Sequence, residues 1–210
     1  IFRQGDRIKI YIGAVEESTK FTKTFVSRKS EELLRGLLEL EVPEIYEEII
    51  EIRNIAREAG SRSKVAVYSN DENLDVKGAC IGRNGMRIQN IIDELCGEKI
   101  DIVLWNEDIT EFVKNALNPA EVLSVEIIEE GEENMKVARV LVAENQLSLA
   151  IGKKGQNSRL AARLCGVKID IHTEPAEIDE FEEYEEDTAF NDSFEDEVEE
   201  SAFAGLHEED

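Results

Sequence analysis

Two short glycine turns carry positive charge in a chain that is otherwise strongly acidic. The first is Gly82-Arg83-Asn84-Gly85 and the second is Gly152-Lys153-Lys154-Gly155. Each turn lies between two segments whose apolar residues recur at helical spacing, so a helix begins at the end of each turn. A helix N-terminus offers unpaired backbone N–H groups and a partial positive charge, and glycine lets another chain approach closely. Together with the Arg and Lys side chains, these turns are typical of a site for a phosphate backbone.

The two turns belong to an internal repeat. Ile-Gly-x-x-Gly occurs at residues 81–85 and again at 151–155, and the pattern Leu-Cys-Gly-x-Lys-Ile-Asp-Ile follows at 95–102 and at 164–171. The second copy has one residue fewer between these motifs. A single turn of this kind would be explained as a tight connection between helices with solvated lysines. Positive charge in both copies favours the phosphate-binding interpretation.

The net charge of −24 by itself argues against a nucleic-acid partner. The charge is unevenly distributed, because residues 173–210 hold 18 Asp or Glu and no Lys or Arg. Residues 1–172 therefore carry 24 basic and 30 acidic residues. The glycine turns lie in a part of the chain that is only mildly acidic.

Several classes of function are disfavoured by what the chain contains. No Ser-His-Asp or Cys-His set is visible, and the P-loop pattern fails because Lys154 follows Gly152-Lys153 where Ser or Thr is needed. His172 and His207 have no partners at metal-ligand spacing. The sequence therefore predicts no catalytic residues, no cofactor and no metal. Three cysteines lie in apolar stretches and are predicted to be buried thiols in a reducing cytoplasm: Cys80, Cys96 and Cys165.

The chain has no apolar run long enough to cross a membrane and no signal-peptide pattern at its start. It begins without Met, which indicates a fragment or a processed chain. Residues 1–29 favour β structure, because Ile8, Ile10 and Ile12 alternate with polar residues. This segment is too short for an independent sheet.

The periodicity of residues 30–172 predicts the order α-β-β-α-α-β twice. The first unit has a helix from Ser30 to Leu40 that ends before Pro43, a hairpin at 47–57 and 64–69, helices at 76–81 and 86–95, and a strand at 99–105. The second unit has a helix at 108–117, strands at 122–128 and 136–142, a helix on each side of the second turn, and a strand at 167–172. Ser30 and Asp75 are predicted helix N-caps.

This arrangement, with Gly-x-x-Gly between the last two helices, resembles the type II KH domain. Two such units in tandem resemble the NusA family of bacterial transcription termination and antitermination factors, in which an S1 domain precedes the KH domains. The stretches that carry the resemblance are 40–45, 56–64, 78–82, 97–103, 115–120 and 147–157. The resemblance implies an α+β fold with a partial S1/OB-like β-barrel segment at 1–29, a first KH domain at 30–105 and a second at 106–172. An unrelated hairpin remains the alternative for residues 1–29.

Residues 173–210 resemble nothing that we can name and are predicted to form a disordered acidic tail. The tail is either a solubilising extension or a polyanion that competes with RNA for the basic turns.

KH domains clamp about four nucleotides of single-stranded nucleic acid at the glycine loop. Phosphate approach is thereby assigned to Gly82, Gly85, Gly152 and Gly155, and phosphate neutralisation to Arg83, Arg87, Lys153, Lys154 and Arg159. Ile81 and Ile151 are expected to wall an apolar groove for bases. Hydrogen bonds to bases or sugars, or alternatively helix capping, are assigned to Asn84, Gln156 and Asn157.

The resemblance implies that the partners are single-stranded RNA of a nascent transcript and RNA polymerase, with the chain a cytoplasmic monomer that does not contact a membrane. The alternative is a protein-interaction module whose KH folds bind RNA weakly or not at all. Four basic residues near the predicted hairpin form either a solvated edge or a second RNA contact: Arg53, Arg57, Arg62 and Lys64. Tyr68 and Trp105, at strand ends, are predicted to be core residues rather than stacking platforms.

Overall fold

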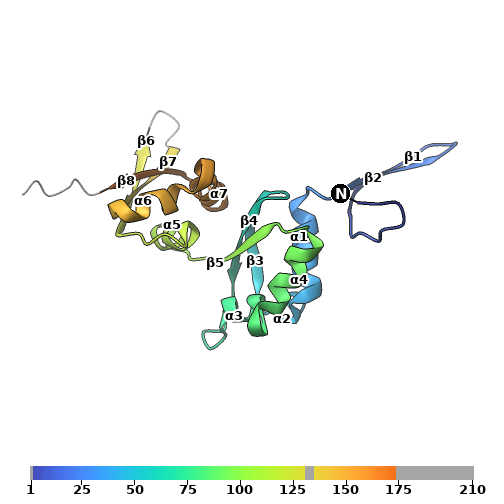
Figure 1. Ribbon diagram of the computed structural model, residues 1–210, viewed down its shortest axis with the longest axis horizontal. Helices are drawn as coiled ribbons and strands as arrows, with labels where there is room; N and C mark the ends of the chain where they lie inside the picture. The colour runs from blue at the N-terminus through green and yellow to red at the C-terminus, as the bar shows by residue number, and fades with distance from the viewer. Residues whose placement is uncertain (1, 131–134, 174–210) are drawn as a thin grey trace, which may run out of the picture. The chain divides into compact units, whose positions relative to one another are not determined.

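The computed structural model describes residues 2–130 and 135–173 (Figure 1). The fold is α+β: a two-stranded hairpin precedes two units, each a three-stranded mixed sheet with helices packed on it. The predicted order α-β-β-α-α-β is confirmed in both units. The acidic tail lies outside the described residues, and the exact domain boundaries stay predictions. Within the described ranges, no helix is long and apolar enough to cross a membrane.

The N-terminal hairpin pairs β1 (Tyr11–Glu17) with β2 (Thr22–Ser27) in antiparallel fashion. The strand predicted from Ile8 begins only at Tyr11, because the backbone of Lys9 is bonded elsewhere. The Lys9 amide donates to Glu94 Oε1 at 3.3 Å, and the Lys9 carbonyl accepts a bond from Arg28 Nη1. These contacts tie the segment to the first unit instead of extending the hairpin.

The first unit contains α1 (Glu31–Glu41), α2 (Pro43–Tyr46), β3 (Glu51–Glu58), β4 (Arg62–Tyr68), α3 (Val76–Ile81), the 3₁₀ turn η1 (Arg83–Gly85), α4 (Met86–Glu94) and β5 (Lys99–Leu104). Strand β4 is central, antiparallel to β3 and parallel to β5. Ser30 and Asp75 cap α1 and α3 as predicted. The first helix ends before Pro43 as predicted, and Pro43 opens the short helix α2, which was not predicted. A proline at the first helical position lacks only an N–H that needs no partner there.

The core of the first unit lies between its helices and one face of the sheet. Leu34, Leu38, Val65, Val67 and Ile91 are almost fully buried there. Cys80 is also buried, and burial raises the pKa of its thiol to about 12.

The prediction that all three cysteines are buried is wrong for Cys96, which is exposed. Cys96 follows the end of α4 with φ of +59°. Its backbone therefore turns away from the helix, and the side chain leaves the core.

The second unit contains α5 (Ile109–Leu117), β6 (Ser124–Glu130), β7 (Met135–Val142), α6 (Glu144–Ile151), the 3₁₀ turn η2 (Lys153–Gly155), α7 (Gln156–Cys165) and β8 (Lys168–Thr173). Strand β7 is antiparallel to β6 and parallel to β8, which repeats the pairing of the first sheet. Leu160, Ala161 and Leu164 of α7 pack with Val140 and other strand residues in the core.

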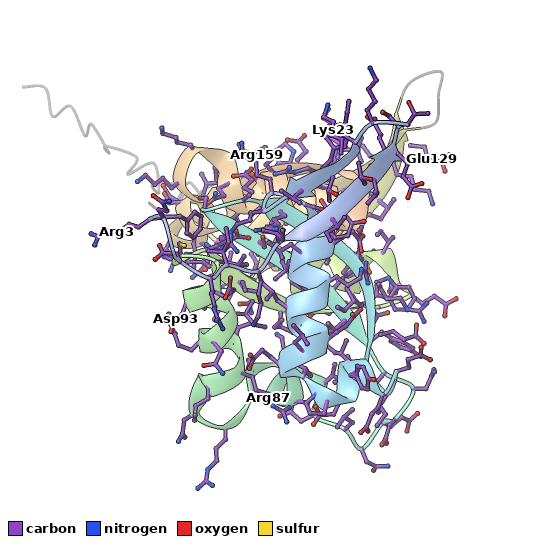
Figure 2. All side chains as sticks on the ribbon, turned by 90° about the vertical axis from the view of Figure 1, so that its right-hand side faces the viewer. Arg3, Lys23, Arg87, Asp93, Glu129 and Arg159 are labelled. Carbon is purple, nitrogen blue, oxygen red and sulfur yellow. The ribbon has the colours of Figure 1, made fainter. Side chains whose placement is uncertain are left out.

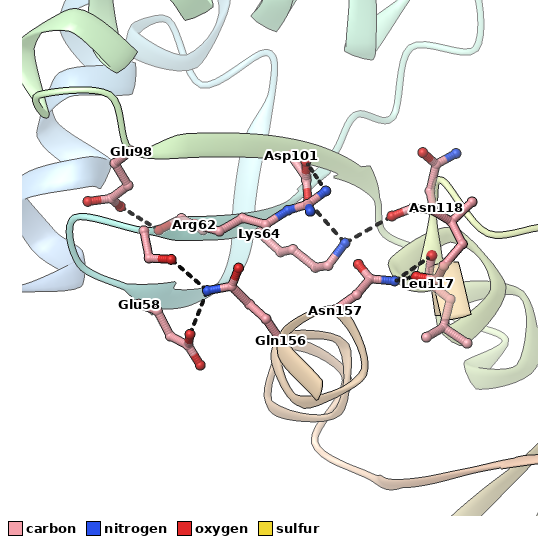
Figure 3. Close-up of polar contacts among 12 residues, drawn as sticks. Glu58, Arg62, Lys64, Glu98, Asp101, Leu117, Asn118, Gln156 and Asn157 are labelled. Atoms are coloured by element: carbon pink, nitrogen blue, oxygen red, sulfur yellow. Dashed lines mark hydrogen bonds and ion pairs between the residues drawn. The ribbon is translucent and has the colours of Figure 1, made fainter. Parts of the chain in front are cut away.

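The second face of the first sheet joins this second core. Ala56, Ala66 and Val103 belong to the same buried cluster as α5 and α7. Polar contacts reinforce the junction, since Asn54 Nδ2 donates to the Leu164 carbonyl at 2.6 Å. Lys64 Nζ donates to the Asn118 carbonyl of the second unit and to Asp101 Oδ2 of the first, both at 3.1 Å (Figure 3). The two units therefore share one packed interface.

All four basic residues near the hairpin are paired within the protein, Arg53 with Glu51 at 3.1 Å. Lys64 is fully buried, and burial lowers the pKa of its ammonium group despite the neighbouring Asp101. Arg57 is buried against Glu98, and Arg62 pairs with Asp101 at 2.7 Å. Arg57 and Lys64 are thus neither a solvated edge nor an RNA contact, because burial leaves them no free surface.

Candidate nucleic-acid interface

The two glycine turns have the same backbone conformation. Gly82 and Gly152 have φ/ψ of 78°/171° and 75°/173°. The third residues, Asn84 and Lys154, are left-handed with φ of 55° and 54°. The sequence repeat is therefore also a repeat in geometry, and each turn leads directly into a helix, α4 or α7.

The two glycines of each turn have different structural roles. A Cβ on Gly82 would lie 2.6 Å from Arg87 Cγ, and a Cβ on Gly152 would lie 2.9 Å from the backbone N of Asn157. The first glycine is thus required for the turn to pack on the following helix. A Cβ on Gly85 would meet nothing within 4 Å. The space beside Gly85 is thus open, which suits close approach by a phosphate, whereas a Cβ on Gly155 would lie 3.8 Å from Arg159 Nη1.

Exposed cations and apolar side chains flank this open surface. Arg83, Asn84, Lys153 and Lys154 are exposed. Over residues 2–130 and 135–173, no carboxylate forms an ion pair with either lysine or with Arg83. Ile81 and Ile151 immediately precede the turns and are 38% and 39% exposed. Each turn thus combines free positive charge with an exposed isoleucine, which suits a phosphate beside a base.

Arg87 and Asn157 occupy matching positions near the start of the following helices, and neither faces the open side. Arg87 Nη1 donates to Glu44 Oε2 at 2.9 Å and to the Ala79 carbonyl at 2.6 Å (Figure 2 labels Arg87). Asn157 is 2% exposed, and its Nδ2 donates to the Leu117 and Ala150 carbonyls at 2.9 and 3.1 Å.

These contacts give Arg87 and Asn157 a structural role. Both side chains donate to carbonyls near the end of the helix before the turn, which holds the shape of the turn. The buried amide of Asn157 has no surface that a base or sugar could reach.

Gln156 and Arg159 point to the first unit and converge on Glu58. Gln156 Nε2 donates to Glu58 Oε2 and to Ser61 Oγ, both at 2.7 Å (Figure 3). Arg159 Nε and Arg163 Nη2 both donate to Glu58 Oε1 at 2.7 Å. Arg159 also donates to the Lys154 carbonyl at 3.0 Å. The second turn is therefore tied to the β3–β4 connection of the first unit.

Glu58 was not among the residues predicted for the site. Its partners lie about a hundred residues further along the chain, so no local pattern indicates them. The hydrogen bond from Arg159, followed by that from Gln156, lowers the pKa of Glu58 from 4.5 to about 2.

Helix capping is not the role of Gln156 or Asn84, because the helices after the turns have no side-chain cap.

The lowered pKa of Glu58 predicts how the stability of the junction depends on pH. A carboxyl group whose pKa is lower in the folded state stabilises the fold above its ordinary pKa, and this stabilisation is lost as pH falls from about 4.5 to about 2. The shift corresponds to at most about 3 kcal/mol, which solvent screening reduces to about 1–2 kcal/mol. Urea unfolding of wild type and Glu58→Gln should differ by this amount at neutral pH. By about pH 3, half or more of the difference should be gone.

A matched control is Glu111→Gln, which removes an exposed carboxylate paired with Lys114 within α5. It should change the unfolding free energy by less than about 0.5 kcal/mol at any pH. A Glu58→Gln difference that stays constant across the acid range would contradict an ionic role for Glu58.

Comparison with known proteins places these turns in a family. The profile of the NusA-like first KH domain matches residues 28–105, and that of the NusA-like second KH domain matches residues 109–179. The chain belongs to the NusA family. Each KH profile contains one of the two turns, so the turns are the Gly-x-x-Gly loops of a NusA-like tandem KH pair. We call them the first loop (residues 82–85) and the second loop (residues 152–155).

Curated relatives carry the name transcription termination/antitermination protein NusA. The protein of Bacillus subtilis is 53% identical over 173 residues, which covers 82% of this chain and 46% of the relative. The protein of Halalkalibacterium halodurans is 52% identical over 173 residues, 82% of this chain and 44% of the relative. The protein of Thermus thermophilus is 52% identical over 182 residues, 87% of this chain and 46% of the relative. The NusA-like chain thus spans less than half the length of these relatives.

A solved structure named "Crystal structure of APE1850" has a TM-score of 0.50 and 24% sequence identity. The match covers 66% of this chain and 96% of that structure. At this identity the likeness concerns the fold alone.

Proposed function

We propose that this chain is the single-stranded RNA-binding part of a bacterial transcription termination and antitermination factor. The observation that carries the proposal is the pair of loops with one backbone geometry and an exposed isoleucine each, with Arg83 on one and Lys153 and Lys154 on the other, exposed and without an ion-pair partner among the described residues. The names of the NusA relatives support a role in transcription, so the proposed ligand is a nascent transcript. The proposed wider partner is RNA polymerase, and the chain acts in the cytoplasm, as a monomer and without catalysis.

The first loop and the second loop would hold RNA by the same mechanism. A phosphate approaches Gly85 or Gly155 at the start of α4 or α7, where the partial positive charge of the helix N-terminus favours an anion. Arg83 neutralises it at the first loop, and Lys153 and Lys154 do so at the second. Ile81 and Ile151 then offer apolar contact to the neighbouring bases.

The remaining residues of the predicted site have supporting roles in this proposal. Asn84 is exposed on the first loop and would hydrogen-bond to a base or a sugar. Gln156 and Arg159 hold the second loop against the first unit through Glu58. Arg87 and Asn157 maintain the shape of the two loops.

The proposal is tested by binding of a labelled, unstructured RNA of about 12 nucleotides, long enough for two sites of about four. Fluorescence anisotropy should give an affinity that falls linearly with salt on a log–log scale from about 50 to about 300 mM KCl. The slope should be about −1.5 to −3, as expected for two to four neutralised phosphates on a single strand.

The matched control is the same RNA annealed to its complement. A duplex keeps the phosphates but hides its bases, so it should bind more weakly. Equal binding of the two forms would contradict recognition of single-stranded RNA. No binding of the single strand would contradict the proposal as a whole and leave the protein-interaction module as the remaining interpretation.

A further inference from the structure

A cluster of Arg53, Tyr68 and Trp105 lies at one end of the first sheet and is not used by either loop. The Arg53 guanidinium carbon lies 4.9 Å from the ring centroid of Tyr68 and 5.0 Å from that of Trp105. The two rings are 5.3 Å apart and nearly perpendicular, at 81°. We call these three side chains the Arg53 platform.

Local backbone geometry brings the three side chains together. The pairing of β3 with β4 shifts between Ile52 and Asn54, which makes Arg53 the extra residue of a β-bulge. A bulge redirects the side chain of the extra residue. Tyr68 is the last residue of β4, and the Trp105 amide donates to the Val67 carbonyl at 2.9 Å, just after β5. Three strands thus contribute one residue each.

The platform is held in place and is partly open. Trp105 packs on Phe112 with ring centroids 6.5 Å apart, and the Tyr68 hydroxyl is bonded to Asn70 Oδ1 at 2.8 Å. Both rings are half-buried, so the prediction that Tyr68 and Trp105 are core residues holds only for part of each side chain. The Arg53 side chain remains 40% exposed.

The charge around Arg53 favours a base over a phosphate. Arg53 Nη2 is already paired with Glu51 Oε2 at 3.1 Å, and this carboxylate would repel an approaching phosphate. An uncharged base is not repelled by the Glu51 carboxylate. Guanidinium planes and aromatic rings both stack on bases. We propose that the Arg53 platform stacks one unpaired base of single-stranded RNA, at a site additional to the two loops. This inference rests on the proposed function for the class of its ligand.

The first arm of the test uses the RNA of about 12 nucleotides with a single abasic site moved along it. Removing the stacked base should weaken binding by about tenfold at one or two positions. Trp105 is the single tryptophan of the chain, so its fluorescence reports directly on the platform. Intact RNA should quench this fluorescence, and the RNA with the critical abasic site should not.

The second arm compares Arg53→Lys with Arg53→Gln. Lysine keeps the charge but lacks the planar group that stacks, so both variants should bind about tenfold more weakly. Both should also become insensitive to the critical abasic site. The matched control is Arg35→Lys, since Arg35 is a similarly exposed arginine of the first unit that pairs with Glu32. It should bind as wild type does, and thermal unfolding checks that all variants are folded.

Two outcomes would overturn the proposal, and a third would separate it from the loop mechanism. If Arg53→Lys retains full affinity and only Arg53→Gln loses it, the contact is ionic and no base stacks there. If neither variant weakens binding while aspartate substitutions in the loops do, the proposed function stands and the platform is only packing. If loop substitutions leave binding unchanged and Arg53 variants weaken it, the loop mechanism fails while the platform is retained.

Discussion

Replacing Lys153 and Lys154 with aspartate should weaken RNA binding on the order of 100-fold while the protein remains folded. Both side chains are exposed, and the structure gives neither an ion-pair partner within the described residues. Lys154 has φ of 54°, a conformation in which Asp is among the better tolerated residues. The substitution therefore reverses the charge of the second loop without adding backbone strain. Anisotropy over a salt series should also show a slope reduced in magnitude by about 1.4 for two lost phosphate contacts.

A charge-matched control separates a local effect from a change in net charge. Lys136 and Lys168 are exposed on strands of the same unit, so Lys136→Glu with Lys168→Glu gives the same change in net charge. This variant should lose less than about threefold in affinity, because it leaves the loop unchanged. Equal losses in the two variants would contradict a loop-specific contact. The corresponding change of Arg83 and Asn84 to aspartate measures the share of the first loop.

Replacing Glu98 with alanine should destabilise the protein by about 3–5 kcal/mol, the largest effect on stability expected in this chain. Glu98 is fully buried and accepts bonds from Arg57 Nε at 2.8 Å, Arg57 Nη2 at 2.9 Å, Ser63 Oγ at 2.6 Å and the Gly60 amide at 2.8 Å. Burial alone would raise the pKa of Glu98, but these bonds outweigh it and hold the pKa below its ordinary value. The alanine variant would leave the charge of Arg57 buried without a carboxylate, with only the Ser30 carbonyl still accepting a bond from it.

Urea unfolding followed by far-ultraviolet circular dichroism measures this loss. Glu32→Ala removes a half-exposed carboxylate that pairs with Arg35, and it should cost less than about 1 kcal/mol. The double variant Arg57→Met with Glu98→Leu should recover most of the lost stability, because it removes both buried charges together. A double variant no more stable than Glu98→Ala would show that packing, rather than an unpaired charge, causes the loss.

The order of the elements and the position of the two loops could be predicted from local patterns in the sequence. Apolar spacing of 3.6 and of 2 residues is a local property, so it indicated helices and strands before any contact was known. The caps at Ser30 and Asp75 were equally local, since each bonds an amide two or three residues away. The repetition of the charged glycine turn could likewise be recognised from the sequence, without any structural information.

Which candidate side chains reach solvent became clear only from the packing of the folded chain. Asn157, Lys64 and Arg57 are polar and looked available, yet each is buried by elements distant in the sequence. No local sequence pattern indicated that Glu58 belongs to the site, because its three partners come from α7. The bulge that turns Arg53 onto two aromatic rings depends on strand register. The physical reason is that burial and side-chain pairing are set by long-range packing, for which a local pattern carries no information.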